Sequence, residues 1–234
     1  SYVAVGSNGA IFSSVDTISW TSRTSGTTRN LRGITYGNNT FVAVGEWGTI
    51  LTSQDGITWD NRTFGDTHML RGIAFGNNTF VAVGGGGITI RSTDNGTSWD
   101  NVSTTGYTNY GVTFGNDRFV KVGYGTLSGN IYPLRSFASY SLDNGTSWGV
   151  EGCSNQSQSR FLAVAYGNNI FSVVGGDGDY NSQFRISCAH QGSGQYEHQM
   201  SAVAFGNNKF VSVGSATISY LSLIHISEPT RQEA

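Results

Sequence analysis

A repeat of 39 residues organises the chain and is the feature that most restricts its fold. The phrase LRGITYGNNTFVAVG begins at residue 31, returns as LRGIAFGNNTFVAVG at residue 70, and recurs in weaker form three more times. The aromatic residue of this phrase recurs at spacings of 39, 39, 39, 52 and 39 residues, at Tyr2, Phe41, Phe80, Phe119, Phe171 and Phe210. Such a period is typical of architectures in which each unit buries its faces only against neighbouring units.

Each unit has the residue pattern of four short β-strands. In residues 31–69, apolar residues alternate with small or polar residues, which is the period of two expected of strands. We expect the strands near residues 33–36, 40–45, 49–53 and 57–61, separated by Gly and Asn residues that tolerate the positive φ of tight turns. A four-stranded antiparallel unit that recurs about every 40 residues predicts an all-β fold, the β-propeller, in which every unit forms one blade.

The repeat divides residues 1–220 into complete and partial blades. It predicts a partial blade, four complete blades and a second partial blade: 1–30, 31–69, 70–108, 109–160, 161–199 and 200–220. Residues 200–205 could supply the missing first strand of residues 1–30 and close a five-bladed ring, but residues 210–214 would then duplicate the strand at residues 2–6. The pattern therefore favours a truncated ring of six to eight blades, of which five to six are represented.

The end of the chain does not follow the repeat. Residues 221–234 contain no glycine, no turn aspartate and no strand alternation, and residues 221–231 (LSLIHISEPTR) resemble the conceptual translation of a sequencing adapter. We therefore expect residues 221–234 to be a non-native tail in which His225 and Glu228 have no functional role. The alternative is a divergent natural terminus.

Composition and charge exclude some classes of partner. Charged residues make up 12% of the chain and the formal net charge is -2, so we expect no nucleic-acid partner. No segment approaches the ~18 consecutive apolar residues of a membrane helix, so we expect no membrane span. We also expect no cofactor. The chain opens at Ser1 inside a strand pattern, so any export signal would lie upstream. Low charge, abundant Gly, Asn, Ser and Thr, and only two cysteines predict an extracellular or cell-surface location.

A second motif recurs between the third and fourth strands of the units. It reads SVDTISW, SQDGITW, STDNGTSW and SLDNGTSW, starting at residues 14, 53, 92 and 141. The aspartate can accept hydrogen bonds from the amides of the turn, the glycine takes the left-handed conformation, and the tryptophan can pack against the next blade. We therefore assign a structural role to the aspartates and tryptophans of the motif: Asp16, Asp55, Asp94, Asp143, Trp20, Trp59, Trp99 and Trp148.

This motif resembles the Asp-box, or BNR repeat, of sialidases, sortilin-type receptors and photosystem II assembly-factor-like propellers. The resemblance covers residues 1–220 and implies a propeller whose ligand site lies on the face opposite the boxes. The copy at residue 53 is one residue short, Thr17 stands where glycine is expected, and the fifth unit has lost the motif at residues 187–194. The resemblance therefore identifies the fold more clearly than the function.

The loops that follow the second strands differ between units and are the expected location of a ligand site. They read Glu46-Trp47 in one unit, three glycines in the next, a longer stretch at residues 124–136, and Gly-Asp-Gly-Asp-Tyr at residues 176–180. Trp47 beside Glu46 suits a sugar, which can stack on the ring while its hydroxyls form hydrogen bonds. The alternative is that Trp47 covers the edge of the blade.

Arg32 and Arg71 begin the innermost strands of adjacent blades and could together bind a carboxylate. Sialidases hold a substrate carboxylate with three arginines, but the equivalent positions here are Tyr110, Leu162 and Ser201. The alternative is that both arginines serve blade packing. The candidate ligand-binding residues are Glu46, Trp47, Arg32, Arg71, Tyr110, Tyr124, Asp177, Asp179 and Tyr180, and we assign no catalytic residue.

Other constellations carry weaker signals. Glu46 with Asp177 or Asp179 is the one carboxylate pair that could serve a glycosidase. Asp177, Asp179 and Asn181 imitate the start of a calcium loop, but its twelfth position is cysteine rather than glutamate, so we expect no calcium.

The two cysteines leave two readings open. Cys153 and Cys188 could form a disulfide, although the strand pattern puts them near opposite faces of one unit. Cys188 with His190 and His198 lacks a fourth ligand at a usual spacing, so we expect no metal.

The sequence favours a non-enzymatic extracellular or surface module that binds a glycan or a protein on its loop-rich face. The alternative is a fragment of a sialidase-like glycoside hydrolase with an incomplete catalytic set. An assembly-factor-like chaperone is a third reading, but it would be expected to carry a charged docking patch.

Overall fold

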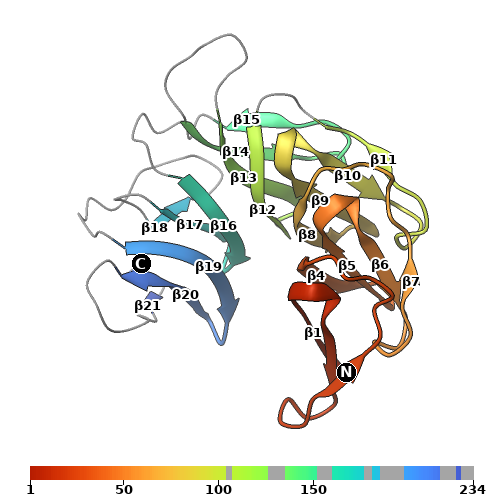
Figure 1. The fold of residues 1–234 in the computed structure, drawn as a ribbon. Coiled ribbons are helices and arrows are strands. Elements are labelled where there is room, and N and C mark those ends of the chain that lie inside the picture. The colour runs from red at the N-terminus through yellow and green to blue at the C-terminus, as the bar shows by residue number, and fades with distance from the viewer. Residues whose placement is uncertain are drawn as a thin grey trace.

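The chain folds into a β-propeller, as the repeat predicted. The structure, a computed structural model, describes residues 1–103, 107–125, 135–151, 160–176, 181–184, 198–216 and 225–227. These residues form six antiparallel sheets arranged as an open arc around a central axis (Figure 1). Within each sheet the strands follow chain order from the inside of the arc outward.

The first three sheets lie in the first half of the arc. The first contains β1 (Tyr2–Val5), the 3-10 turn η1 (Ser7–Gly9), β2 (Ile11–Ser14) and β3 (Thr21–Arg23). The second contains β4 (Leu31–Gly37), β5 (Thr40–Gly45), η2 (Glu46–Gly48), β6 (Ile50–Ser53) and β7 (Asp60–Asn61). The third contains β8 (Leu70–Gly76), β9 (Thr79–Gly84), η3 (Gly85–Gly87), β10 (Thr89–Ser92) and β11 (Asp100–Asn101).

The other three sheets complete the arc. The fourth contains β12 (Tyr107–Gly115), β13 (Arg118–Gly125), β14 (Arg135–Ser141) and β15 (Gly149–Glu151). The fifth contains β16 (Arg160–Gly167), β17 (Ile170–Gly176) and β18 (Asn181–Phe184). The sixth contains β19 (His198–Gly206), β20 (Lys209–Ala216) and β21 (His225–Ser227), and β21 falls within the stretch that the sequence indicated as a tail.

The strands expected in residues 31–69 are observed, with one correction. The fourth strand is only β7, because the residues before it belong to a turn around Asp55. The backbone amides of Ile57 and Thr58 both donate hydrogen bonds to Asp55 Oδ1, each at 2.8 Å, which prevents them from pairing with β6. A side chain that bonds nearby amides offers the backbone an alternative to a strand ladder.

The residues that could have closed a five-bladed ring pair elsewhere. β19 pairs with β20, from Met200 opposite Gly214 to Gly206 opposite Lys209. β1 pairs with β2 alone among the described residues.

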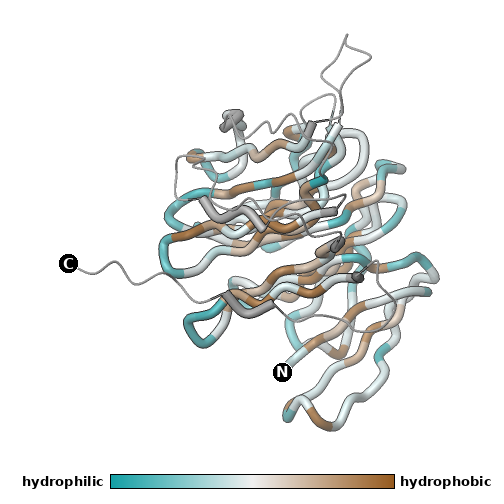
Figure 2. The backbone as a smooth tube through the Cα atoms, turned by 90° about the vertical axis from the view of Figure 1, so that its left-hand side faces the viewer, coloured by the Kyte–Doolittle hydropathy of each residue, from teal (hydrophilic) through white to brown (hydrophobic). Residues whose placement is uncertain are grey.

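The core lies between successive sheets. Alternate residues of β5 and β6 face the third sheet, where Val42, Val44 and Ile50 meet Phe80 and Ala82, all buried. Figure 2 shows apolar residues concentrated along the strands and hydrophilic residues at the hairpin turns. At roughly 25 cal/mol for each Å² of apolar surface removed from water, these faces stabilise the fold only when neighbouring sheets pack on them.

The innermost strands approach one another closely at small residues. A Cβ atom added to Gly33 would lie 3.3 Å from the carbonyl oxygen of Arg71, and one on Gly111 would lie 3.2 Å from Cα of Ala163. The glycine of the phrase LRG therefore sets the spacing of β4, β8 and β12 around the axis, because a larger residue would push the strands apart.

Lys121 on β13 is the one lysine among the buried residues of the described chain. Its side chain is 1% exposed, its Nζ donates a hydrogen bond to Thr89 Oγ1 at 3.0 Å, and it lies 4.2 Å from the ring centroid of Trp148. The equivalent residues in the second and third sheets are Ala43 and Ala82. Burial disfavours the charged form and lowers the pKa of Lys121 to about 7.

We expect the stability of the protein to rise with pH above neutrality because of Lys121. Between its folded pKa of about 7 and its unfolded pKa near 10.5, the unfolded chain binds a proton that the folded chain does not. The free energy of unfolding should rise by up to about 1.4 kcal/mol per pH unit in that window, as urea titrations would show. Lys121→Met should remove this slope, whereas Lys209→Met, at an exposed position, should keep it. Equal slopes in wild type and Lys121→Met would contradict the expectation.

The aspartate turns, which we define as residues 14–20, 53–59, 92–99 and 141–148, share a pattern of serine and aspartate hydrogen bonds. In three of them the tryptophan Nε1 also donates to a turn carbonyl, whereas Trp59 Nε1 is buried with no partner among the described residues. In the fourth turn, Ser141 Oγ accepts the amide of Gly145 at 2.8 Å, Asp143 Oδ1 accepts the amide of Ser147 at 2.8 Å, and Trp148 Nε1 donates to the carbonyl of Gly145 at 3.1 Å. Burial raises the pKa of Asp143, but the bonds from Ser147 and Ser141 bring it down to about 2. These bonds lie within the turn itself, and the structural role of the motif residues stays a prediction.

The first aspartate turn contains strained backbone. Thr17 has φ of 65°, where the other three turns have glycine at the same place. A β-branched residue in the left-handed region is an outlier, and the conformation costs ordinary residues roughly 1–2 kcal/mol.

We therefore expect Thr17→Gly to stabilise the protein by about 0.5–1 kcal/mol, since relief of strain exceeds the added flexibility of the unfolded chain. Urea unfolding monitored by tryptophan fluorescence would measure the change. Thr24→Gly, at a threonine with ordinary φ in the same blade, should instead lower stability. A loss of stability in Thr17→Gly would show that the turn is not strained.

Candidate functional site

The propeller has two edges with different contents. At one edge lie the Asn-Asn hairpin turns and the aspartate turns, and Asn38 Nδ2 donates to Asn95 Oδ1 of the next unit at 2.6 Å. We call the other edge the loop face. It contains η1, η2, η3 and the connections between sheets. In the second sheet, for example, Leu31 at the start of β4 pairs with Gly45 at the end of β5, so η2 and the connection into β4 lie at the same edge. The variable loops therefore lie opposite the aspartate turns, as the sequence predicted.

A β-bulge at the loop face sets the orientation of one residue in every complete inner strand. The register of β4 with β5 shifts between Leu31 and Gly33, which leaves Arg32 as the extra residue. The same shift occurs around Arg71, Tyr110, Leu162 and Ser201. Bulges re-aim side chains and are frequent beside functional sites. The sequence comparison of Arg32 and Arg71 with their equivalents in the other units therefore concerned the residue that the bulge directs to the loop face.

Arg71, Tyr110, Tyr124 and Arg160 form a stack on the loop face, which we call the tyrosine stack. The rings of Tyr110 and Tyr124 are parallel within 18°, with centroids 5.1 Å apart, and the Tyr110 hydroxyl donates to that of Tyr124 at 3.1 Å. The guanidinium of Arg71 lies 4.5 Å from the Tyr110 centroid, and that of Arg160 lies 4.9 Å from the Tyr124 centroid. Two cations thus cover the outer faces of two stacked rings.

Some polar groups of the tyrosine stack have a hydrogen-bond partner and one does not. Burial and the hydrogen bond with Tyr124 raise the pKa of Tyr110, so its phenol stays protonated at neutral pH. Arg71 Nε is buried and has no hydrogen-bond partner among the described residues. An unpaired buried donor carries a desolvation cost of roughly 1–3 kcal/mol that an acceptor would relieve.

Arg32 forms a separate ion pair instead of joining Arg71. Its Nη2 lies 2.7 Å from Glu46 Oε1, which also accepts a bond from Asn30 Nδ2 at 2.9 Å. The bonds from Arg32 and Asn30 lower the pKa of Glu46. Glu46 is therefore ionised and engaged, which does not suit a general acid, and the two arginines make different contacts rather than one carboxylate clasp.

Trp47 is exposed, but a cation lies over one face of its ring. The side chain is 53% exposed, and the guanidinium of Arg29 lies 4.8 Å from the ring centroid. Its backbone is left-handed, with φ of 57°. The equivalent turn residues are Asn8 and Gly86, which adopt this conformation at lower cost.

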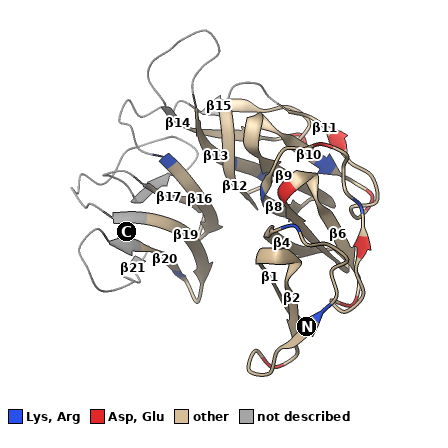
Figure 3. Cartoon of the chain, viewed as in Figure 1, with Lys and Arg blue, Asp and Glu red and all other residues tan. Residues whose placement is uncertain are grey.

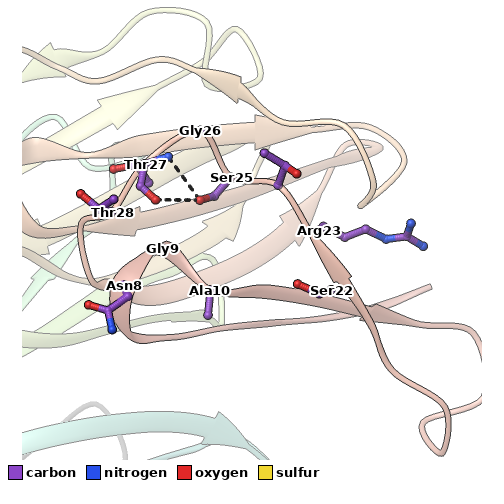
Figure 4. A pocket seen from close by; sticks show the side chains of 10 residues that line it. Asn8, Gly9, Ala10, Ser22, Arg23, Ser25, Gly26, Thr27 and Thr28 are labelled. Carbon is purple, nitrogen blue, oxygen red and sulfur yellow. Dashed lines mark hydrogen bonds between the residues drawn. The ribbon is translucent and has the colours of Figure 1, made fainter.

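A polar hollow of about 670 Å³ lies in the first blade, between η1 and the connection after β3 (Figure 4). The fifth residue after the tryptophan of the aspartate turn is Phe64 in the second unit, where it packs against the core, and Ser25 in the first. Ser25 Oγ bonds the carbonyl of Thr27 at 3.1 Å, and Arg23 extends away from Asn8. The hollow is therefore the space that a phenylalanine fills in the next blade.

Several predicted candidates lie outside the described residues. Asp177, Asp179, Tyr180, Cys153 and Cys188 are in this group, so the carboxylate pair, the calcium loop and the disulfide stay predictions. In the part of the chain that is described, no group of three or more His, Cys, Asp or Glu residues could hold a metal ion, and no helix is long and apolar enough to cross a membrane. Charged segments are spread over the arc rather than gathered (Figure 3).

Sequence reasoning missed Arg160, Arg29 and Asn30, which complete the contacts of Tyr124, Trp47 and Glu46. Arg160 and Asn30 occupy equivalent positions, directly before the residue at which the register shifts, Phe161 and Leu31 respectively. That position is next to the bulge and could have been compared across units in the same way as Arg32 and Arg71.

The stack makes a prediction about the ionisation of Tyr110. In Tyr124→Phe the ring contact is kept and the hydroxyl partner is lost, so the pKa of Tyr110 should fall while burial still holds it above its ordinary value of 10.0. NMR titration of ring-labelled tyrosine would measure both proteins, with Tyr140→Phe as a control outside the stack. An unchanged pKa of Tyr110 in Tyr124→Phe would show that the hydroxyl contact is not made.

Comparison of the sequence with protein-family models and with curated proteins finds no match. Solved structures, in contrast, are similar in fold. YCF48 bound to D1 peptide matches with a TM-score of 0.62 and 15% sequence identity, over 91% of this chain and 68% of that chain. YCF48 from Cyanidioschyzon merolae matches with a TM-score of 0.56 and 17% identity, over 84% of this chain and 71% of that chain.

A chain of the nidogen/laminin complex is also similar, with a TM-score of 0.64 and 10% identity, over 97% of this chain and 92% of that chain. At these identities the likeness establishes the fold and nothing about the site. The chain is a β-propeller similar in architecture to YCF48 and to a component of the nidogen/laminin complex.

Proposed function

We propose that this chain is a non-enzymatic binding module that takes a carboxylate-bearing peptide segment of a protein ligand at the tyrosine stack. The observation that carries the proposal is Arg71 Nε, a buried donor with no partner among the described residues beside two stacked rings. A guanidinium held over an aromatic ring can bind a carboxylate with its in-plane N–H groups while its flat face stays on the ring.

The surroundings of the stack suit a peptide. Tyr110 and Tyr124 are half-buried, so they offer apolar edges to an extended chain, and tyrosine and arginine are enriched at protein-binding sites. Both YCF48 and the nidogen/laminin complex are structures of propeller proteins with a peptide or protein partner. These partners support a peptide or protein as the class of ligand. The carboxylate that we propose for it rests on the residues of the tyrosine stack in this chain.

Two finer features belong to the same proposal. We assign the aspartate turns to the Asp-box type, because the Ser–Asp contact recurs in all four turns and the Trp contact in three. The proposed ligand would then bind at the opposite edge. We also propose a location outside the cell or at its surface, which the low content of charged residues supports.

A glycan is a second candidate because Trp47 is exposed at the same face. One ring face lies under Arg29, which leaves a single face for a sugar. The hydrolase alternative has weaker support, since Glu46 is held as an ionised partner of Arg32.

The test is peptide binding by wild type and by two charge-matched variants. Immobilised hexapeptides without acidic side chains and with a free carboxyl terminus should bind wild type, and the same peptides amidated, which carry no carboxylate, should not. Arg71→Gln should weaken binding by about tenfold or more, the typical effect of removing a charged hydrogen-bond donor. Arg118→Gln, which removes the same charge from the opposite edge, should leave binding within about twofold.

Three outcomes would contradict the peptide proposal. The first is that wild type binds no peptide, and the second is that both arginine variants are affected equally. The third is that a glycan array gives binding that Trp47→Ala abolishes and Arg71→Gln does not, which would favour the glycan candidate. Turnover of a fluorogenic sialoside would support the hydrolase instead.

A further inference from the structure

Two positions of a blade lie side by side at the loop face. The bulge position is the extra residue of the inner strand, and the loop position is the residue that follows the glycine of FVAVG or FVKVG. In the second blade they are Arg32 and Glu46, with Arg32 Nη2 2.7 Å from Glu46 Oε1. In the fourth blade they are Tyr110 and Tyr124, with ring centroids 5.1 Å apart. The fold therefore brings these two positions together whether their side chains are charged or aromatic.

The third blade has an arginine at the bulge position and no side chain at the loop position. The arginine is Arg71, and Gly85 stands where Glu46 stands in the second blade. A Cβ atom added to Gly85 would meet only the carbonyl oxygen of Met69 among the described residues, at 3.9 Å. The third blade thus has room for a side chain beside Arg71 but supplies none.

The backbone presents the two loop positions in the same way. The amide of Glu46 donates to the carbonyl oxygen of Asn30 at 3.0 Å. The amide of Gly85 donates to the carbonyl oxygen of Met69, the equivalent residue, at 2.9 Å. The residue before each loop position is extended, with φ of -167° in one blade and -174° in the other. A side chain at Gly85 would therefore leave the backbone in the direction that Glu46 takes toward Arg32.

Arg71 lacks the carboxylate that Arg32 contacts. Among the described residues Arg71 forms no ion pair, and its Nε is buried without a hydrogen-bond partner. Its guanidinium lies 4.5 Å from the ring centroid of Tyr110. This contact uses the flat face of the guanidinium and leaves its in-plane N–H groups for an acceptor.

We propose that the ligand carboxylate binds above Gly85, in the place that the Glu46 carboxylate occupies one blade earlier, and that Gly85 is the specificity-determining residue. The inference rests on the proposed function and adds the position of the carboxylate within the site. The second blade does not take a carboxylate, because Glu46 already occupies Arg32. A chain terminus and an acidic side chain both supply this chemistry, and the experiment distinguishes them.

One contact of the second blade is absent from the third. Asn30 Nδ2 donates to Glu46 Oε1 at 2.9 Å. The equivalent residue is Met69, whose thioether has no hydrogen to donate. Met69→Asn should therefore strengthen binding of the carboxylate several-fold, since it adds a donor to a charged acceptor.

Gly85→Glu tests the position without a ligand. Gly85 does not have a left-handed backbone and has open space around it, so the variant should fold. The introduced carboxyl should bond Arg71 and titrate at low pH, just as the bond from Arg32 lowers the pKa of Glu46. Ser7→Glu puts the same charge at the loop position of the first blade, and its carboxyl should titrate at higher pH. NMR titration of glutamate labelled at the side-chain carboxyl would compare the two.

Peptide binding tests the same position with a ligand. One fluorescein-labelled hexapeptide has a free carboxyl terminus and no acidic side chain, and the other has an amidated terminus and one central glutamate. Gly85→Glu should weaken every peptide that binds wild type by about tenfold or more, because its own carboxylate fills the place. Ser7→Glu should stay within about twofold of wild type. The two peptides show whether a terminus or a side chain supplies the carboxylate.

Two results would overturn the inference even if wild type binds peptide. One is a carboxyl in Gly85→Glu that titrates at the same pH as that in Ser7→Glu, and the other is peptide binding by Gly85→Glu as tight as by wild type. If wild type binds neither peptide, the proposed function fails. The titration of Gly85→Glu then decides by itself whether the third blade holds a carboxylate beside Arg71.

Discussion

The packing of one sheet face on the next is the constraint on which the rest of this structure depends. Each core cluster of the described residues spans two neighbouring sheets. The side chains of Val42 and Val44 are buried because Phe80 and Ala82 of the following sheet cover them. Glycine at the inner strands keeps neighbouring sheets close enough for this contact. Phe80, Phe119, Phe171 and Phe210 are buried in this way, whereas Tyr2 at the equivalent position of the first sheet is exposed.

The repeat separates the residues that maintain the scaffold from those that can vary. The aspartate turns hold one edge through local hydrogen bonds that recur in each copy. At the loop face, a bulge recurs in each inner strand, but its extra residue is Arg32 in one unit and Tyr110 in another. Because the backbone directs this residue to the same edge every time, substitution there changes the ligand site without disturbing the packing.

Much of the fold could be predicted, because it follows from local patterns. The alternation in residues 31–69 located the first three strands, and the variable loops were placed on the edge opposite the aspartate turns. The candidate site was predicted only in part. Arg71 was named, but it was grouped with Arg32, which instead pairs with Glu46. The stack on Tyr110 depends on a contact with Tyr124 across two strands, and spacing along the chain does not reveal such contacts.

The sequence by itself determined the period, the strand order and the edge on which each loop lies, since these depend on residues close together in the chain. The tertiary structure alone decided which arginine contacts which partner and that Lys121 is buried beside Thr89. The physical reason is that desolvation, ring stacking and ion pairing act between neighbouring sheets, and their geometry exists only once those sheets have packed.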